Sequence, residues 1–280
     1  MAKTSRGKAG SPAECWRWWS QCHQLLLLRL LRVYLPPARQ HMRLLYIGHD
    51  ITTALTSLKP WGEVVSLLAD THAQATRQVR KTLRTRTEDP YLSGRLIEGK
   101  FPNCVPFSNR SFDVIILTDV LEWLPKTEVP NGLRRAAELL RAGGVCLAGV
   151  PAAHSMNLQW RDQATQPYFF RQEEVCRLFE TAGLRVLLVS HCNTFTAPLM
   201  IMNKLMGFVP APDAPGTLPA VLKTSLAALS AVESSLLPWL PLPWGLSLAV
   251  VACVGESITL PRAVQKAGSI AIAPAEGQFA

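Results

Sequence analysis

Arg110-Ser-Phe-Asp-Val-Ile-Ile-Leu-Thr-Asp-Val-Leu-Glu-Trp-Leu124 contains the clearest strand signal in this chain of 280 residues. Within it, residues 113–118 form a short and nearly continuous apolar run that is rich in Ile and Val. Such a run is typical of a parallel strand that is covered on both faces of its sheet. We therefore expect residues 113–118 to form a central strand.

The residues that follow predict a helix, a glycine turn and a second strand. Residues 132–141 place apolar side chains on one helical face and charged side chains on the other, and Gly143-Gly144 should stop that helix. The apolar run 145–150 comes directly after the glycines. A strand, a helix and a parallel strand in succession are almost always connected in the right-handed sense, and this succession predicts an α/β fold.

This succession resembles the second half of a class I S-adenosylmethionine-dependent methyltransferase of the small-molecule type 11 kind. That family typically has a strand, Leu-Glu-His, a helix that ends in Pro-Gly-Gly, and a further strand followed by Pro. Here Trp123 stands where the His usually is, and Ala142 replaces the first Pro, while Gly143-Gly144 and Val150-Pro151 match. The resemblance continues through residues 168–186 and covers about residues 40–255.

The resemblance implies a Rossmann-like α/β domain, in which helices cover both faces of a mostly parallel sheet of seven strands in the order 3-2-1-4-5-7-6. Residues 43–48 and 63–70 would be the first two strands. Residues 186–190 and 246–254 would lie side by side and antiparallel. The implied cofactor is S-adenosylmethionine.

The junction after the first predicted strand departs most from the family. The family has a glycine-rich loop, G-x-G-x-G, at this place, because the backbone must approach the methionine part of the cofactor with no Cβ in the way. This chain keeps Gly48 of that set, and His49, Asp50 and Thr52 occupy the remaining places. Asp50 is also a good N-cap for the helix expected at residues 49–58, so two roles are open for it.

A carboxylate follows the second predicted strand at a spacing that suits an adenosine cofactor. Asp70 comes after Gly48 at close to the separation of about 20 residues at which an acid binds the ribose hydroxyls. Its alternative role is an exposed cap for a helix at residues 71–83. Phe101 would stack on the adenine or else be a buried core aromatic. The cofactor positions implied by the resemblance are Gly48, His49, Asp50, Asp70, Thr71, Phe101 and Thr118.

Composition indicates a globular chain with an anionic neighbour. The hydrophobic content is 48%, the charged content is 18% and the net charge is +9, which suits lipid headgroups or nucleic acid. However, the basic cluster at residues 77–86 lacks interleaved aromatic side chains. The end of the predicted fourth strand, Thr118-Asp-Val-Leu-Glu122, also differs from the Asn-Pro-Pro-Tyr type that grips a flipped base. These two features argue against nucleic acid as a partner.

The seven cysteines are scattered singly, with no CxxC pair. This spacing fits neither a zinc site nor a disulfide scaffold, so we expect no metal site. Free thiols are typical of a reducing compartment, and we therefore expect a cytoplasmic protein.

The first 38 residues leave several alternatives open. Residues 1–13 form a basic tail that should be disordered, and residues 14–38 predict an amphipathic helix that Pro36-Pro37 ends. This helix would either pack over the sheet edge, lie on a membrane surface as a peripheral contact, or belong to a segment for organelle import.

The remaining segments complete the predicted domain organisation. A methyltransferase-like domain would span residues 39–255, with an insertion at 195–240 that contains a helix from residue 220 to 237, and a flexible tail would span residues 256–280. Residues 236–254 approach the length of a transmembrane span. Pro238, Pro241 and Pro243 favour instead a Pro-rich entry into a strand.

Two functions from different classes follow from these observations. The first is methyl transfer from S-adenosylmethionine to a small or lipid-like acceptor. The second is a catalytically inactive binding or scaffold protein that could associate with a membrane. The degraded glycine loop favours this second function. The polar loop at residues 152–166 would face the substrate, so His154 is a candidate general base, although a lone loop His is commonly only solvated.

Overall fold

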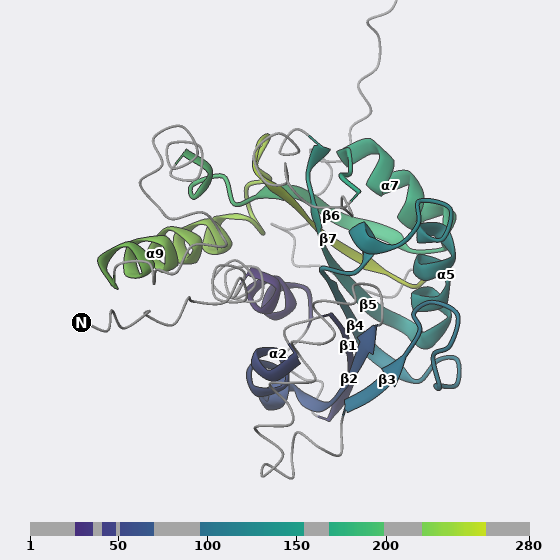
Figure 1. Cartoon of the computed structure of the whole chain (residues 1–280). Coiled ribbons are helices and arrows are strands. Elements are labelled where there is room, and N and C mark those ends of the chain that lie inside the picture. The colour runs from purple at the N-terminus through teal and green to yellow at the C-terminus, as the bar shows by residue number, and fades with distance from the viewer. Residues whose placement is uncertain are drawn as a thin grey trace, which may run out of the picture.

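The computed structural model in Figure 1 describes residues 26–35, 41–48, 51–69, 96–153, 168–198 and 220–255. The predictions for the tails at 1–13 and 256–280, the start of the N-terminal helix, the helix at 71–83 and the loop at 154–166 lie outside these residues.

A single sheet of seven strands organises the described residues, and its order is β3-β2-β1-β4-β5-β7-β6. This confirms the predicted α/β fold class and the predicted order. The strands are β1 (Met42–Ile47), β2 (Gly62–Ala69), β3 (Leu96–Gly99), β4 (Phe112–Thr118), β5 (Leu140–Pro151), β6 (Arg185–Cys192) and β7 (Ser247–Cys253).

The pairing of the strands is parallel from β3 to β5 and antiparallel around β7. β1 pairs with β2 on one side and with β4 on the other, with Leu45 opposite both Val65 and Ile115. β7 inserts antiparallel between β5 and β6. The prediction that the last two strands lie side by side and antiparallel is therefore confirmed. Residues 247–253 form a strand, as expected, and not a membrane helix.

Helices cover both faces of this sheet, as Figure 1 shows. One face carries α5 (Val129–Leu139) and α7 (Gln172–Thr181), and the other carries α2 (Ile51–Leu58) and the helix at residues 26–34. Alternate residues of β1 serve the two cores: Leu45 and Ile47 face α5 and α7, while Leu44 and Tyr46 face the opposite core. This period of two is the pattern of a strand that is buried on both faces.

The junction between α5 and β5 differs from the prediction. α5 ends at Leu139 instead of residue 141, and β5 begins at Leu140, before the two glycines that were expected to stop the helix. The reason is that Leu140 already pairs with Phe112 of β4, and the register then shifts before Val114 pairs with Val145. Gly143, at φ 70°, accommodates the irregular backbone between these two pairings.

Residues 26–34 are helical and pack closely on the sheet. Leu30 and Leu31 are fully buried in the same core as α2, and Tyr34 is 2% exposed. In the described part of this segment the apolar side chains therefore face the domain. The segment with Trp16, Trp18 and Trp19 lies outside the described residues.

The predicted insertion contributes one described helix, α9 (Ala220–Leu236), which agrees with the helix expected from residue 220. None of the helices in the described part of the chain combines the length and the apolarity that a bilayer crossing requires.

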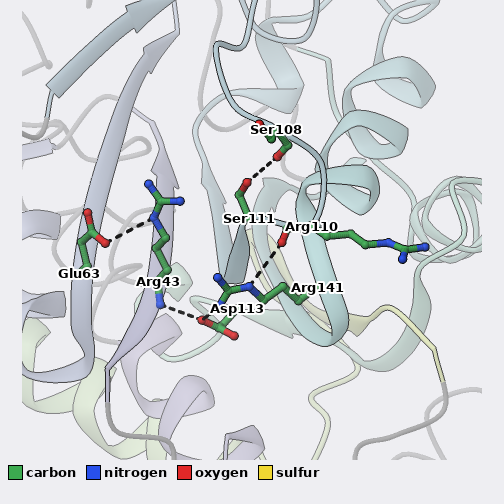
Figure 2. Close-up of polar contacts among 7 residues, drawn as sticks. All are labelled: Arg43, Glu63, Ser108, Arg110, Ser111, Asp113 and Arg141. Carbon is green, nitrogen blue, oxygen red and sulfur yellow. Dashed lines mark hydrogen bonds and ion pairs between the residues drawn. The ribbon is translucent and has the colours of Figure 1, made fainter.

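An ion cluster joins the amino ends of three neighbouring strands. Figure 2 shows the Asp113 carboxylate of β4 between β1 and β5, where its Oδ2 atom accepts hydrogen bonds from the Arg43 backbone N–H and from Arg141 Nη1, both at 2.9 Å. The Asp113 side chain is 14% exposed. Glu63, which pairs with the Arg43 Nε atom at 3.4 Å, is 54% exposed. The Asp113 carboxylate therefore links strands away from solvent, whereas the Glu63 carboxylate lies in an exposed ion pair.

We expect Asp113→Ala to lower the free energy of unfolding by about 1–3 kcal/mol, because it leaves a backbone N–H and a guanidinium without their charged acceptor. Glu63→Ala should change it by less than about 0.5 kcal/mol, since exposed ion pairs contribute little. Urea unfolding followed by circular dichroism measures both changes. Equal effects of the two substitutions would contradict this account of the cluster.

Candidate functional site

The order of the strands creates a topological switch point between β1 and β4, at the end of the sheet where the parallel strands terminate. The chain runs outward from β1 through β2 to β3 and then returns to the other side of β1 as β4. The connections that leave the carboxyl ends of β1 and β4 therefore diverge, and sheets of this kind bind ligands at that point. Gly48 follows β1 and Asp119 follows β4 at this edge.

Gly48 lies in close contact with two hydroxyl groups. A Cβ atom at this position would lie 2.5 Å from Thr118 Oγ1 and 2.7 Å from the Tyr46 hydroxyl oxygen. These two groups are buried, and Thr118 Oγ1 donates a hydrogen bond of 2.8 Å to the Tyr46 oxygen. The structure therefore gives Gly48 a packing reason in addition to any approach by a cofactor, because any larger residue would displace β4 or the tyrosine.

Two carboxyl groups follow β4 directly. Asp119 has a φ of 54°, in the left-handed region that non-glycine residues rarely adopt and that is often found at functional sites. Glu122 lies in the short helix η2 (Leu121–Trp123) and is only 7% exposed. Its Oε2 atom is buried and has no hydrogen-bond partner within the described part of the chain.

The environment of Glu122 favours its neutral form. Burial raises the pKa of Glu122 well above its ordinary value, and the nearby negative charge of Asp119 raises it further. Two carboxyl groups of different character therefore lie together after β4, and Glu122 is the one whose neutral form is favoured. Such a neutral acid can donate a hydrogen bond to a ligand.

A short segment, residues 168–170, closes this edge against η2 and the end of β5. The Tyr168 N–H donates to the Glu122 carbonyl at 2.7 Å, and the Phe170 N–H donates to the Pro151 carbonyl at 2.9 Å. Beside it, the Lys126 Nζ atom lies 4.7 Å from the Tyr168 ring centroid and 3.4 Å from Glu174 Oε1. The backbone of η2 and of the β5 end is therefore held by main-chain bonds from residues 168–170.

The structure brings two of the predicted cofactor residues together, since Gly48 and Thr118 are in contact at the β1 and β4 ends. Phe101 lies elsewhere, in the core, where its ring packs against Gly132 of α5 and is 4% exposed. So little of the ring is accessible that we leave Phe101 out of the proposed adenine site. The predicted residues that lie outside the described part of the chain are His49, Asp50, Asp70, Thr71 and His154.

The site also contains residues that the sequence alone did not single out as functional: Tyr46, Asp119 and Glu122. One signal was available for the two acids, since both directly follow a predicted parallel strand, at the edge where such sheets bind ligands. No sequence signal showed that Tyr46 would be bonded to Thr118, because the two residues belong to strands that are far apart in the chain. Among the described residues, no cluster of three His, Cys, Asp or Glu side chains could hold a metal ion.

The strand order is the one expected for a class I S-adenosylmethionine-dependent methyltransferase fold. Residues 18–189, more than half of the chain, match the profile of a family described as "Methyltransferase domain", and the chain therefore belongs to this family. The cofactor of the family is S-adenosylmethionine. The match thus confirms the class of protein and the cofactor that the sequence predicted.

Curated relatives match a shorter part of the chain. The tRNA N(3)-cytidine methyltransferase METTL2 of Bos taurus is 34% identical over 92 residues, which are 28% of this chain and 24% of the relative. The protein of the same name from Danio rerio is 33% identical over 95 residues, or 29% of this chain and 27% of the relative. The chain thus spans about a quarter of the length of these relatives.

Solved structures share the fold along most of the chain. The complex of the Haloferax volcanii Trm112 methyltransferase activator with a methyltransferase superposes with a TM-score of 0.53 at 15% identity, and covers 88% of this chain and 96% of that one. The [4+2]-cyclase SpnF gives a TM-score of 0.51 at 17% identity, with coverages of 85% and 84%. Since a cyclase and a methyltransferase share this fold, the acceptor must be argued from the site.

The described residues at the β1 and β4 ends suit the chemistry of S-adenosylmethionine. This cofactor presents an ammonium group, ribose hydroxyls and a positively charged sulfonium, which carries the methyl group that it supplies. The Asp119 carboxylate can accept hydrogen bonds from such a molecule. Gly48 brings its backbone to the same strand ends, so Gly48 and Asp119 could hold the cofactor, whereas the Thr118 hydroxyl is buried and bonded to Tyr46.

We expect Glu122→Gln to change how stability depends on pH. Because the folded pKa is raised, Glu122 favours folding fully below its unfolded pKa of 4.5, and that stability is lost as the pH rises toward the folded pKa. The free energy of unfolding of the wild type should therefore fall relative to the Gln variant by up to about 1.4 kcal/mol per pH unit in this window.

Chemical unfolding at a series of pH values above 4.5 measures this difference. Glu138→Gln, at an exposed position of α5, is the control for the same change of side chain away from a buried site. A pH-independent difference for Glu122→Gln would show that Glu122 ionises normally in the folded protein.

Proposed function

We propose that this chain transfers the methyl group of S-adenosylmethionine to a small or lipid-like acceptor. The observation that carries the proposal is the buried Glu122 carboxyl group, which has one oxygen without a partner among the described residues and adjoins Asp119 at the ligand-binding edge. A buried polar atom without a partner costs stability, so its retention at this edge is explained if a ligand completes its hydrogen bonding.

The charge of this edge supports a small acceptor over a polyanion. Asp119 brings a negative charge to the β4 end, and among the described residues of this edge Lys126 is paired with Glu174. Binding of nucleic acid depends mainly on cations that neutralise phosphates. The relatives that are named tRNA methyltransferases nevertheless give no support to the earlier expectation against nucleic acid, so tRNA is the competing acceptor in the test below.

The residues of this site would act mainly by alignment. Methyl transfer requires the nucleophile, the methyl group and the sulfur to be in line, and correct positioning alone supplies much of the rate. In this proposal the neutral Glu122 donates a hydrogen bond to the acceptor, and Asp119 accepts one from the cofactor or the acceptor. Residues 168–170 hold the carbonyl of Glu122 and thereby fix the orientation of η2.

The second candidate function is an inactive scaffold, and one observation favours it. The family's glycine-rich loop is reduced to Gly48, and this glycine is already in contact with Tyr46 and Thr118. A scaffold of this kind would keep the fold but would not bind the cofactor. The two functions are therefore separated by a measurement of cofactor binding.

We expect the wild-type protein to bind S-adenosylmethionine and Asp70→Ala to bind it at least about tenfold more weakly, because hydrogen bonds to a charged acceptor contribute about 1.5–3 kcal/mol each. Isothermal titration calorimetry measures both affinities. Glu63→Ala is the matched control, since Glu63 lies near the opposite end of β2, and it should leave the affinity unchanged. No heat from the wild type would favour the scaffold, and unaltered binding by Asp70→Ala would reject the assigned ribose ligand.

We expect radiolabelled methyl groups from S-adenosylmethionine to appear in an organic extract of small molecules and lipids when the protein is supplied with it, and not in total tRNA supplied in parallel. Glu122→Leu should lower the transfer by about tenfold, because it removes the proposed hydrogen-bond donor, whereas Glu122→Gln keeps an N–H donor and should retain more of the transfer. Glu180→Leu, at an exposed position of α7, is the control. Label in tRNA would contradict the proposed acceptor class.

A further inference from the structure

Over residues 227–236, helix α9 is inverted relative to an ordinary surface helix. The side chains that it buries there are polar, namely Ser230, Glu233 and Ser234, which are 7%, 2% and 1% exposed, and Leu237 directly after the helix is buried as well. The residues that it exposes include Leu229, Val232 and Leu236. A helix on a water-soluble domain normally shows the opposite arrangement, with its apolar stripe toward the core. The exposed side of α9 is therefore built for an environment less polar than water.

The buried polar face has a clear structural role. The Glu233 carboxylate accepts a hydrogen bond of 3.0 Å from the Phe195 backbone N–H in the turn that follows β6. Burial raises the pKa of Glu233, while hydrogen bonds from the backbone of this turn oppose the rise. These bonds fix which side of α9 faces the domain, so the apolar side cannot be turned inward without losing them.

The apolar side continues beyond the end of the helix. Leu229, Val232 and Leu236 follow one another at helical spacing, and Trp239, Leu240 and Trp244 extend the same exposed apolar character into the segment that enters β7. Val232, Trp239 and Leu240 are each more than half exposed, at 54%, 51% and 58%. We call these six residues the α9 apolar surface. Large apolar side chains that are exposed together along one segment in this way indicate an interaction site.

The charges around the α9 apolar surface indicate which kind of partner it would bind. From residue 220 to 244 the sole acidic residue is Glu233, which is buried, so the α9 apolar surface carries no negative charge of its own. Arg29, on the helix at residues 26–34, donates a hydrogen bond to Ser235 beside Leu236, and Arg32 is exposed on the same helix. A cation thus lies beside the apolar residues at Leu236. Figure 1 shows that α9 projects from the sheet on the side of this helix.

We propose that the α9 apolar surface docks on an anionic lipid surface, with its leucine, valine and tryptophan side chains inserted at the boundary between headgroups and acyl chains. Tryptophan favours this boundary because its ring is apolar and its N–H is polar, and flanking arginines interact with anionic headgroups. A second copy of the chain is disfavoured, because each copy carries a net charge of +9 and the two would repel each other. This inference does not depend on methyl transfer or on binding of the cofactor.

Vesicle binding of the full chain tests the proposal. Vesicles of phosphatidylcholine with phosphatidylglycerol should bind the protein, and vesicles of phosphatidylcholine alone should bind it at least about tenfold more weakly, because a basic surface gains affinity from anionic lipid. The double substitution Trp239→Ser and Leu240→Ser should lower binding to the anionic vesicles by at least about tenfold, since it removes buried apolar area. Flotation on a density gradient measures the bound fraction.

The matched control applies the same kind of change to small exposed residues of the same helix, Ala227→Ser with Ala228→Ser, and should leave binding within about twofold of the wild type. Thermal unfolding should be the same for both double variants, because all four side chains are exposed.

Three outcomes would overturn the proposal. They are failure of the wild type to bind anionic vesicles, equal binding by the Trp239 and Leu240 double variant, and a concentration-dependent dimer in sedimentation velocity that this variant abolishes. The last outcome would assign the surface to a second copy of the chain.

Discussion

The parallel pairing of β1 with β4 is the contact on which both ends of the sheet depend. These strands are distant in sequence, and Leu44, Leu45, Tyr46 and Ile47 pair with consecutive residues of β4. At the amino end the pairing places Asp113 where it can bond Arg43 and Arg141, and at the carboxyl end it brings Thr118 against Tyr46 and Gly48. One register therefore sets the ion cluster and the ligand-binding edge together, and a slip of one residue would turn every side chain to the other face.

Sequence patterns predicted most of this fold because its strands are buried on both faces. The apolar run at residues 113–118, and the antiparallel final pair, could be placed from hydrophobicity and from the family resemblance. The end of α5 was predicted incorrectly, since Leu140 belongs by periodicity to the helix but is bound by its pairing with Phe112. Here a tertiary contact overrides a local pattern, which no analysis of the local sequence can detect.

The candidate site was less predictable for a physical reason. Gly48 and Thr118 could be named from the resemblance, but the properties of Glu122 arise from burial, from the charge of Asp119 and from an oxygen without a partner among the described residues. These are properties of packing between segments, and the sequence of the η2 segment contains none of them. The inverted α9 shows the same limit. Its apolar and polar residues are evident in the sequence, whereas the side that faces water is set by the bond between Glu233 and the Phe195 backbone.

The proposed cofactor site at the β1 and β4 carboxyl ends and the proposed docking of α9 on lipid would together place the reaction on an acceptor close to a membrane. The central claim is that the cofactor binds at this edge of the sheet. Hydrogen–deuterium exchange with and without S-adenosylhomocysteine, the demethylated product, tests this claim most directly. The account predicts slower exchange at residues 46–51 and 118–123, with no change at residues 110–113 or in α9. Protection confined to other segments, or no protection at a saturating concentration of the product, would contradict it.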